Sequence, residues 1–492
     1  MKIILAVILL ICINNTFAFR LNQHSSLNKG LKYRGVDIKE ELESLKFDRL
    51  FTDSSSSSTP QSQWFTQQLD HFDPLNDNTF QQQFLVNDTY WDQNGPIFIL
   101  LGGEGPIAPS YVQGHFILNT YAEKFNALIV AVEHRGYGQS VVGDLDINSG
   151  LKYITVEQAL ADYATFRQYI VEKYSAYNNK WVSFGGSYSG SLSAWFRLKY
   201  PQLIDAAIAT SAPVQAQLDF SEYFEVVSRS LGPECSAMFK NITNTVTEMI
   251  QQGQNQQVEE LFQACDPIES ELDFATFMES LSGGPSEIVQ YNNDNKATFT
   301  NITTMCTQIG QSSNPLEAFA EWNQQFNIYS GSNCTTSSYQ SFIQSMQETD
   351  PLGDNAAAIA WTWQTCIEFG YYQDGESPNQ PFSSAITLDY FVQQCTDIFG
   401  PSNFTYQPAI NWINTEYGAR NLQTSNIVMA NGFVDPWSSL GIINSTDPSI
   451  QTILIPTGAH CSDLYAPLPT DSAALQQARS MAVNLISQIV SQ

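Results

Sequence analysis

The chain has 492 residues, 43% of them hydrophobic, which is enough for one large domain with an insertion or for two or three domains. Its 49 acidic and 21 basic residues give a formal net charge of -28 at pH 7. Such a surface repels nucleic acid and anionic membranes, so the composition argues against both as partners and suits an acidic compartment, where self-repulsion falls.

The N-terminus is predicted to direct export. Residues 1–18 combine Lys2, an apolar run too short to span a bilayer and small residues near Ala18, which is the pattern of a cleaved signal peptide. No later stretch is apolar enough for a membrane helix, so we expect a secreted or lysosomal protein. Residues 19–62 end in a run of serines and are predicted to be a pro-segment or a flexible linker; the sequence leaves open whether they are removed.

Asn-x-Ser/Thr sequons in an exported protein are candidate glycosylation sites on the surface. Six lie beyond residue 18: Asn87, Asn241, Asn301, Asn333, Asn403 and Asn444. We expect several of them to be glycosylated.

Strand and helix patterns alternate between residues 63 and 214. Strands are expected at 64–72, 80–86, 95–101, 127–132 and 205–210, and in the run from Trp181 that breaks into glycines. Helices are expected at 111–125 and, after a capping box formed by Thr155 and Gln158, from Val156 onward. This alternation predicts a parallel sheet with helices on both faces.

The alternation stops between residues 215 and 421, a stretch rich in Gln, Asn and Ser with helical segments such as 258–264 and 389–399. It resumes with strands at 426–430 and 451–455 and ends with a helix at 471–489. We therefore expect an α/β domain built from residues 63–214 and 422–492 and interrupted by a mainly helical insertion.

Cysteine positions support this division. Loss of Cys12 with the signal leaves seven cysteines, and six lie in the insertion and predict three disulfides of undetermined pairing: Cys235, Cys265, Cys306, Cys334, Cys366 and Cys395. Cys461 is then expected to be a free thiol. Because Cys-x-x-Cys and His-x-x-x-His spacings are missing, we expect no metal site and no cofactor.

The run Gly185-Gly-Ser-Tyr-Ser-Gly190 is typical of a nucleophile elbow, in which small residues two before and two after a serine allow a tight strand-to-helix turn. Ser187 is the better candidate nucleophile, because a turn centred on Ser189 would place Ser187 where glycine is needed. Ser183 has no glycine before it. The motif alone also fits an ordinary glycine-rich turn.

A serine nucleophile needs a base and an acid that orients the base. In an α/β-hydrolase they follow the serine in the order Asp, His, on loops after late strands. His460 satisfies this order, and Asp435, after the preceding strand, is the candidate acid, although Asp435-Pro436 also fits a simple turn. The remaining histidines lie before the serine: His24, His71, His115 and His134.

The oxyanion of a tetrahedral intermediate needs backbone donors. We expect one donor to be the Tyr188 N–H at the start of a helix, and the other to be the N–H of Gly103 or Glu104, after the first buried strand. Three charged residues at strand ends near this site are expected to form structural pairs: Glu104, Glu133 and Arg135.

Further motifs accompany the elbow: Leu69-Asp-His-Phe72, Glu133-His-Arg-Gly-Tyr-Gly138, Ala194-Trp-Phe-Arg-Leu-Lys-Tyr-Pro201, Asn431-Gly-Phe-Val-Asp-Pro-Trp437 and Gly458-Ala-His460. With them, nearly the whole mature chain resembles the serine peptidase family of lysosomal prolyl carboxypeptidase, dipeptidyl peptidase II and thymus-specific serine protease. The resemblance implies an α/β-hydrolase domain with a large, mainly helical, disulfide-stapled cap insertion. It also carries the triad onto Ser187, Asp435 and His460.

Two features depart from the exopeptidases of that family. The loop Gly102-Gly-Glu-Gly-Pro106 replaces an Asn-Glu-Gly-Asp form, and Ser189 replaces a glycine. Both bring the chain nearer to the thymus-specific serine protease branch, and they leave exopeptidase specificity open.

We therefore expect a serine peptidase that hydrolyses short peptides through an acyl-enzyme, as a carboxypeptidase or a dipeptidyl peptidase. Cleavage after proline is implied by the resemblance alone. The expected partner is a peptide substrate, and a homodimer is left open. The rival interpretations are an esterase or lipase on the same fold and an inactive hydrolase-like binding protein; the intact triad residues argue against the latter.

Overall fold

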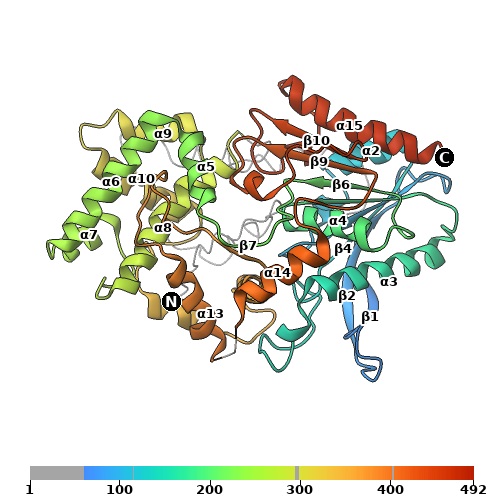
Figure 1. Cartoon of the computed structure of the whole chain (residues 1–492), viewed down its shortest axis with the longest axis horizontal. Coiled ribbons are helices and arrows are strands. Elements are labelled where there is room, and N and C mark those ends of the chain that lie inside the picture. Colours follow the sequence, from blue (N-terminus) through green and yellow to red (C-terminus); the bar gives the residue numbers. More distant parts are fainter. Residues whose placement is uncertain (1–59, 115, 294–298, 402–403) are drawn as a thin grey trace, which may run out of the picture.

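The computed structural model describes residues 60–114, 116–293, 299–401 and 404–492. A mixed eight-stranded sheet with flanking helices forms one lobe, and a second lobe consists mainly of helices (Figure 1). The expected signal peptide and nearly all of segment 19–62 lie outside the described residues.

The sheet has the strand order β1-β2-β4-β3-β5-β6-β9-β10. Its strands are β1 (Gln63–Gln68), β2 (Thr79–Asn87), β3 (Ile97–Leu101), β4 (Leu128–Val132), β5 (Trp181–Gly186), β6 (Ala206–Thr210), β9 (Ile427–Gly432) and β10 (Ile450–Ile455). β2 pairs antiparallel with β1 and β4, and the remaining pairs are parallel. Each strand expected from the sequence is present, and the sheet is parallel except around β2.

Strand β3 shows why its sequence is continuously apolar, since side chains on both faces of the sheet are buried. Ile97, Ile99 and Leu101 pack in the core with α3 (Val156–Tyr174) and α4 (Tyr188–Lys199). Phe98 and Leu100 pack in the opposite core with α2 (Ile117–Phe125) and α15 (Ala473–Val490). The expected α/β-hydrolase architecture is therefore confirmed.

Helix α3 begins as predicted, with the Thr155 hydroxyl accepting a hydrogen bond from the Gln158 N–H at 3.3 Å. The Gln158 side chain does not complete a capping box. Its Oε1 accepts from the His71 N–H at 3.0 Å, and its Nε2 donates to Asp70 at 2.7 Å. Gln158 thus ties α3 to the loop between β1 and β2, which is why the sequence pattern predicted only half of this helix start correctly.

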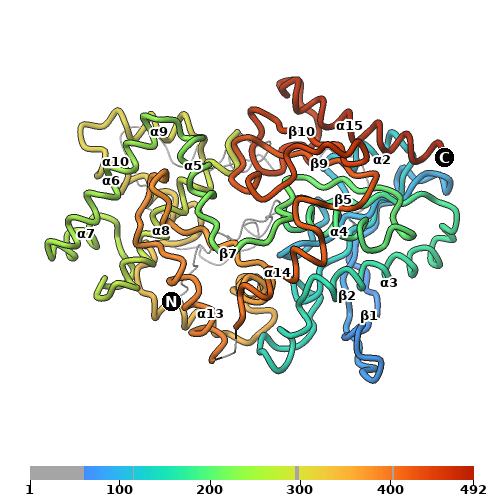
Figure 2. Tube along the Cα trace, in the orientation of Figure 1, coloured from blue at the N-terminus to red at the C-terminus, as the bar shows by residue number. Residues whose placement is uncertain are grey.

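Helices of residues 215–421, called the helical insertion below, form the second lobe between β6 and β9; Figure 2 traces this segment from green to orange. They are α5 (Glu222–Leu231), α6 (Pro233–Gln251), α7 (Asn255–Phe262), α8 (Glu271–Gln290), α9 (Ile302–Gly310), α10 (Pro315–Tyr329), α11 (Tyr339–Ser345), α12 (Ala356–Gln364), α13 (Leu388–Phe399) and α14 (Tyr406–Tyr417). A π-helix, η5 (Thr365–Phe369), and a parallel pair, β7 (Gln217–Asp219) with β8 (Gly370–Tyr372), were not expected from the sequence.

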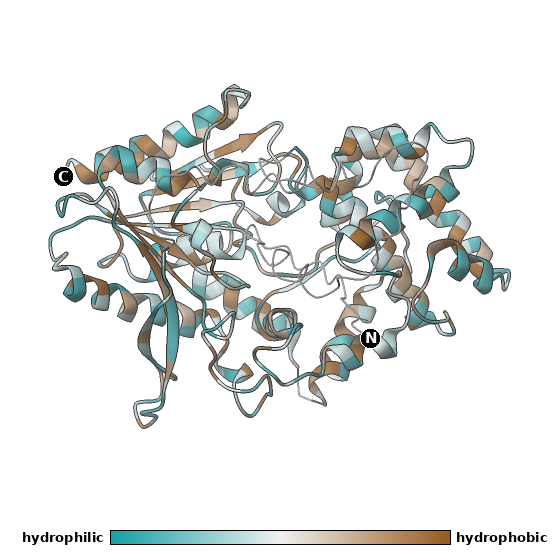
Figure 3. Cartoon of the chain, turned by 180° about the vertical axis from the view of Figure 1, so that it is seen from behind, coloured by the Kyte–Doolittle hydropathy of each residue, from teal (hydrophilic) through white to brown (hydrophobic). Residues whose placement is uncertain are grey.

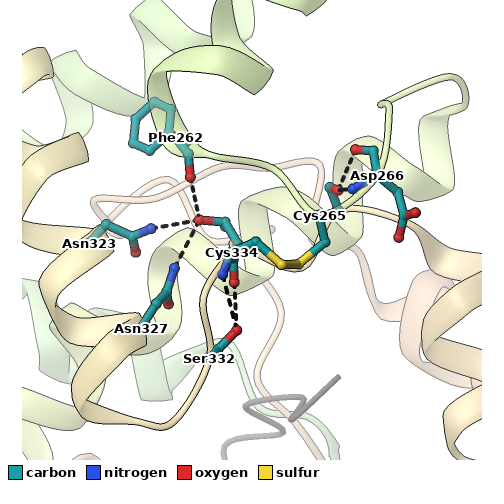
Figure 4. The surroundings of a disulfide bond; sticks show 9 residues. Phe262, Cys265, Asp266, Asn323, Asn327, Ser332 and Cys334 are labelled. Atoms are coloured by element: carbon teal, nitrogen blue, oxygen red, sulfur yellow. Dashed lines mark hydrogen bonds between the residues drawn. A yellow bond between two sulfur atoms is a disulfide. The ribbon is translucent and has the colours of Figure 1, made fainter. Parts of the chain in front are cut away.

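Three disulfides join elements of the helical insertion: Cys235–Cys306, Cys265–Cys334 and Cys366–Cys395. The prediction that these six cysteines pair among themselves is confirmed. Beside the second bridge, Asn323 and Asn327 of α10 donate to the Thr335 hydroxyl at 2.9 and 3.0 Å, and this hydroxyl donates to the Phe262 carbonyl at the end of α7 (Figure 4). The bridge and these bonds together hold α7 against α10.

The expectation of a free thiol at Cys461 is wrong. Cys461 is disulfide-bonded, and none of the cysteines in the described ranges is free. The expectation depended on the odd count that remains after removal of Cys12. The full chain has eight cysteines, so that parity argument does not apply to it.

Hydrophobic residues concentrate in the central strands, which are brown in Figure 3, whereas hydrophilic positions mark the outer faces of many helices. Within the ranges given above, no helix is long and apolar enough to cross a membrane.

Three buried glutamates have no Lys, Arg or His at ion-pair distance in the described part of the chain. They are Glu104, Glu133 and Glu368, and each is at most 5% exposed. Burial raises the pKa of each carboxyl from an ordinary value of 4.5 to about 7, because the charged form loses its hydration. Hydrogen bonds to Glu133 and Glu368 oppose part of this rise.

These pKa values predict a fold that is more stable in acid. Between pH 4.5 and 7 the folded protein binds more protons than the unfolded chain, so the free energy of unfolding falls as the pH rises through 7. Thermal unfolding at constant ionic strength should show a melting temperature several degrees higher at about pH 5 than at about pH 7.5.

Glu104→Gln is the sharpest variant for this prediction, because a neutral amide replaces the carboxyl that has no donor from another residue. We expect it to raise the melting temperature near pH 7.5 and to leave it unchanged near pH 5. A wild-type protein that is equally or more stable near pH 7.5 would contradict this account of the buried carboxyls.

Candidate active site

Ser187 lies on the tight turn from β5 into α4. Its backbone angles, φ 60° and ψ -133°, fall in a region that residues other than glycine rarely adopt. Two residues earlier, a Cβ at Gly185 would lie 2.0 Å from the carbonyl oxygen of Ser189, so the turn requires glycine there. The turn has the strained strand-to-helix form that presents a nucleophile at the carboxyl edge of a sheet.

Ser189 occupies the position where the elbow motif usually has glycine. Its hydroxyl donates to the Leu101 carbonyl at 2.5 Å, which ties α4 to the end of β3. A Cβ at Gly103 would lie 3.3 Å from the Ser189 Cβ, closer than most such contacts, so the missing side chain at Gly103 leaves room for Ser189. The two departures from the exopeptidase pattern therefore contact each other in the structure.

Asp435 and His460 meet because the loops after β9 and β10 stay side by side beyond the paired strands. The Phe433 N–H donates to the Ile455 carbonyl at 2.9 Å, and the Val434 N–H to the Gly458 carbonyl at 3.0 Å. A Cβ at Gly432 would lie 2.2 Å from the Gly458 carbonyl oxygen. Only glycine permits this close approach of the two loops.

Within this contact, Nδ1 of His460 lies 2.9 Å from Oδ1 of Asp435, and neither side chain is exposed. The distance suits a hydrogen bond, but the ring N–H is not well aligned with the carboxylate. Oδ1 also accepts from the Trp437 N–H at 2.9 Å, which fixes the carboxylate at the start of η6 (Pro436–Leu440). Nε2 of His460 has no partner among the described residues and is available to a hydroxyl.

Two hydrogen bonds hold Ser187 and the loop of His460 to one short turn after β6. The Ser187 N–H donates to the Thr210 carbonyl at 3.0 Å. The next residue, Ser211, accepts through its hydroxyl from the N–H of Cys461, which directly follows His460, at 3.0 Å. The turn at Thr210 and Ser211 therefore places the elbow beside the loop that carries the candidate base.

The Tyr188 and Gly103 N–H groups are free donors beside the elbow. Neither has an acceptor among the described residues, and Gly103 lies against the Ser189 backbone. The Glu104 N–H also has no acceptor among the described residues, but Gly103 is the residue that packs directly against the elbow at Ser189. Of the two alternatives for the second oxyanion donor, the geometry favours Gly103.

The structural pairing expected for Arg135 is confirmed, with a partner that the sequence did not identify. Its guanidinium donates to both carboxylate oxygens of Asp162, at 2.6 Å each, and Nε2 of His71 lies 2.8 Å from the same carboxylate. Three buried side chains from distant segments therefore meet in one cluster centred on the Asp162 carboxylate. A strand-end charge can find such a partner on a distant helix, which sequence proximity does not reveal.

Glu133 and Glu104 differ in their hydrogen-bond partners. Glu133 accepts from the Ile107 N–H at 3.1 Å and from the Ser140 hydroxyl at 2.7 Å, so it holds the loop after β3 to the loop after β4. Glu104 has no ion pair, and its charge acts on three tyrosines, among them Tyr291. The Tyr291 ring lies 6.0 Å from the ring of the candidate base, His460.

The other histidines do not compete with His460 as the base. His71 binds Asp162, and both ring nitrogens of His134 are occupied, by the Arg135 carbonyl at 2.7 Å and the Tyr188 hydroxyl at 3.0 Å. His24 and His115 lie outside the described residues.

Sequons differ in accessibility. Asn241, Asn333 and Asn444 are exposed, Asn301 caps α9 by accepting from the Thr304 N–H, and Asn403 lies outside the described residues. The Asn87 Nδ2 donates to the Val112 carbonyl at 2.6 Å, a bond that a glycan on this nitrogen would disturb.

In the described ranges, no group of three or more His, Cys, Asp or Glu side chains could hold a metal ion.

Sequence reasoning missed two buried glutamines of the helical insertion that contact the site. The Gln290 carbonyl accepts from the His460 N–H at 2.8 Å, and its Oε1 accepts from the Trp437 indole at 3.0 Å. Gln364 donates to the Tyr188 hydroxyl at 3.0 Å. No local signal marks either residue in a segment so rich in glutamine.

Comparisons with known proteins agree with this geometry. The family model described as serine carboxypeptidase S28 matches residues 67–482. A Caenorhabditis elegans protein named as a serine protease is 35% identical over 97% of this chain and 97% of its own length. The thymus-specific serine protease of Homo sapiens is 33% identical, covering 88% of this chain and 87% of its own. The lysosomal Pro-X carboxypeptidase of Bos taurus is 27% identical, covering 87% of this chain and 87% of its own.

Among solved structures, the proline iminopeptidase of Mycobacterium smegmatis aligns with 87% of this chain and 99% of its own, with a TM-score of 0.42 and 11% identity.

The elbow geometry predicts different outcomes for two neighbouring serines. Ser187→Ala should abolish labelling by a phosphonate serine probe and reduce peptide hydrolysis by at least about 1,000-fold. Ser189→Ala loses one hydrogen bond and should keep labelling and measurable activity. Mass spectrometry of the labelled protein identifies the modified residue, and label that persists in a folded Ser187→Ala protein would remove Ser187 as the nucleophile.

Proposed function

The chain belongs to the serine carboxypeptidase S28 family, and we propose that it hydrolyses short peptides after proline, with Ser187 as nucleophile, His460 as base and Asp435 as orienting acid. Membership makes the protein a serine peptidase. The triad, the substrate length and the preference for proline are the proposed steps beyond that.

One observation carries the triad: the fully buried contact between His460 Nδ1 and Asp435 Oδ1, with the opposite ring nitrogen free of partners among the described residues. A carboxylate at Nδ1 favours the tautomer with a proton on that nitrogen and leaves Nε2 as an acceptor. Ser187 lies on the adjacent elbow, held to the same turn after β6. Each residue is thus supported in its role by its local geometry.

In the proposed acylation, His460 Nε2 takes the proton of the Ser187 hydroxyl while Oγ attacks the carbonyl carbon of the scissile bond. Negative charge develops on the carbonyl oxygen, where the Tyr188 and Gly103 N–H groups can stabilise it. His460 then gives its proton to the departing amine, the C–N bond breaks, and the acyl group remains as an ester on Ser187.

Deacylation repeats these steps with water. His460 takes a proton from the water molecule as its oxygen attacks the ester carbon. The proton then passes to Oγ of Ser187 as the C–O bond breaks, which releases the acid product and restores the free hydroxyl. Asp435 stabilises the imidazolium in both halves of the reaction.

The preference for proline is carried over from the relative named lysosomal Pro-X carboxypeptidase, and a row of buried aromatic rings gives the region beside the triad an apolar frame. The rings of Tyr188 and Phe369 lie 5.4 Å apart, those of Phe369 and Tyr371 5.2 Å, and those of Tyr371 and Trp437 5.5 Å. This row connects the residue after Ser187 with the turn after Asp435. All four rings are at most 7% exposed, so the row packs as core between the elbow and the acid.

The helical insertion supports the limit to short peptides. Gln290 and Gln364 of the insertion contact the His460 loop and the elbow, so its helices pack against the site from both sides. The proposed compartment is the lysosome or the secretory pathway, in line with the N-terminal pattern, the lysosomal relative and the fold stability expected in acid.

A peptide panel tests the proposed specificity. Short peptides with proline, alanine or leucine before the scissile bond, free or blocked at each end, should be compared with acyl esters from about pH 4 to pH 8. We expect kcat/KM to be at least about 10-fold higher for proline than for alanine.

Two outcomes of the panel would change the proposal. Equal or better cleavage of peptides without proline would reject the post-proline preference. Hydrolysis of long-chain esters with no peptide cleavage would favour the esterase or lipase interpretation instead.

Glu104 gives a physical reason for better carboxypeptidase action in acid. Its buried carboxyl, with a pKa raised to about 7 by burial, is neutral at low pH and negative above it. Among the described residues no cation lies at ion-pair distance from this charge, which acts on Tyr291, a residue whose ring lies 6.0 Å from that of His460. Above pH 7 it should repel the C-terminal carboxylate of a peptide substrate.

Glu104→Gln is therefore expected to raise kcat/KM several-fold near pH 7.5 for peptides with a free C-terminus, and to change it little near pH 5. Peptides with an amidated C-terminus serve as the matched control and should respond equally at both pH values. A variant that loses activity on both substrates at both pH values would instead assign Glu104 to the catalytic framework.

A further inference from the structure

The side chain of Tyr188, whose N–H is the expected oxyanion donor, is held by the helical insertion. Its ring lies 5.4 Å from the rings of both Trp361 and Phe369, which flank the junction of α12 and η5. Its hydroxyl lies 3.0 Å from Nε2 of His134 and 3.0 Å from Nε2 of Gln364. Tyr188 therefore contacts the α/β domain on one side and the insertion on the other.

Chemistry fixes the direction of the bond to His134. Its Nδ1 lies 2.7 Å from the Arg135 carbonyl, which can only accept, so Nδ1 carries the proton. Burial also lowers the pKa of His134 to about 4, so above that pH the ring is neutral and Nε2 is an acceptor. The Tyr188 hydroxyl must donate its single proton to His134.

The lone pairs of the Tyr188 oxygen are then free to accept from Gln364. The Gln364 amide uses both N–H donors and its oxygen in this network. Nε2 donates to Tyr188 and to Glu368, each at 3.0 Å, and Oε1 accepts from the Tyr137 hydroxyl at 2.6 Å. Glu368 in turn accepts from the Val156 N–H at 2.9 Å. Gln364 is fully buried and cannot exchange these partners for water.

We propose that Gln364 is a positioning residue, which holds Tyr188 from the helical insertion and thereby fixes the oxyanion-binding N–H beside Ser187. The inference rests on the proposed function, because it assumes that Ser187 reacts and that the Tyr188 N–H stabilises the oxyanion. It makes the insertion part of the catalytic framework as well as a cover over the site.

The local structure supports this role. Gln364 is the last residue of α12 and is followed directly by η5, a π-helix, and π-helical segments in proteins often occur at functional sites. Within η5, Cys366 is tied to α13 by the bridge to Cys395. The insertion thus holds the Gln364 amide in place independently of its bond to Tyr188.

Loss of this hold should affect the rate of the chemical step more than substrate binding. The oxyanion charge exists only around the transition state, so a displaced N–H lowers kcat while KM changes little. Displacement of an oxyanion donor costs roughly 10- to 100-fold in rate.

The test compares variants of matched size. Gln364→Leu, which keeps the volume but removes the amide, and Tyr188→Phe, which removes only the hydroxyl, should each lower kcat by about 10- to 100-fold with KM changed less than about threefold. Both variants remove the bond between Gln364 and Tyr188, and Tyr188→Phe also removes the bond to His134. The kcat of the double variant should therefore lie within a few-fold of the kcat of the less active single variant.

Gln394→Leu is the control, since Gln394 is another buried glutamine of the insertion, on α13, whose Nε2 has no partner among the described residues. It should leave kcat unchanged. If Gln364→Leu does not fold, Tyr188→Phe still tests the same bond from the other side.

Unchanged kcat in a folded Tyr188→Phe protein would overturn the inference, and so would a loss in Gln364→Leu that falls entirely on KM. Fully multiplicative effects of the two substitutions would also contradict it. Failure of the proposed function is recognised separately, by activity or probe labelling that survives Ser187→Ala.

Discussion

The contact of two buried polar side chains, Asp435 and His460, is the constraint on which the rest of the site depends. Such a pair is stable away from water only if the surrounding backbone holds both partners in place. The parallel pairing of β9 with β10 supplies that hold, and Gly432 lets the two loops approach closely. The elbow at Ser187 is joined to the same place through the turn after β6, so four neighbouring strands converge on the proposed reaction centre.

The helical insertion completes this centre from the opposite side. Gln290 bonds to the backbone of His460 and to the indole of Trp437, beside the acid. Gln364 bonds to Tyr188, beside the nucleophile. The disulfides stabilise the insertion itself, and the two glutamines transmit that rigidity to the α/β domain. The proposed positioning role would give the segment of about two hundred residues between β6 and β9 a function beyond covering the site.

Much of this arrangement could be predicted from sequence because local patterns determine it. The apolar runs of β3, β4 and β5, the glycines around Ser187 and the order Ser, Asp, His depend on neighbouring residues. What the sequence could not reveal depends on distant partners. Arg135 pairs with Asp162 of α3, Gln158 turns from its own helix start toward His71, and β7 pairs with β8 across most of the insertion. The disulfide pairing and the state of Cys461 likewise require three-dimensional proximity or the full cysteine count.

The central claim is that Ser187 reacts while the Tyr188 and Gly103 N–H groups bind the oxyanion, and a crystal structure of the protein after reaction with a phosphonate peptide analogue tests it most directly. The account predicts a phosphorus bond to Ser187 Oγ, a phosphoryl oxygen within hydrogen-bond distance of both N–H groups, and His460 Nε2 next to Oγ. A phosphonate bound to another residue, or a phosphoryl oxygen directed away from Tyr188 and Gly103, would contradict it.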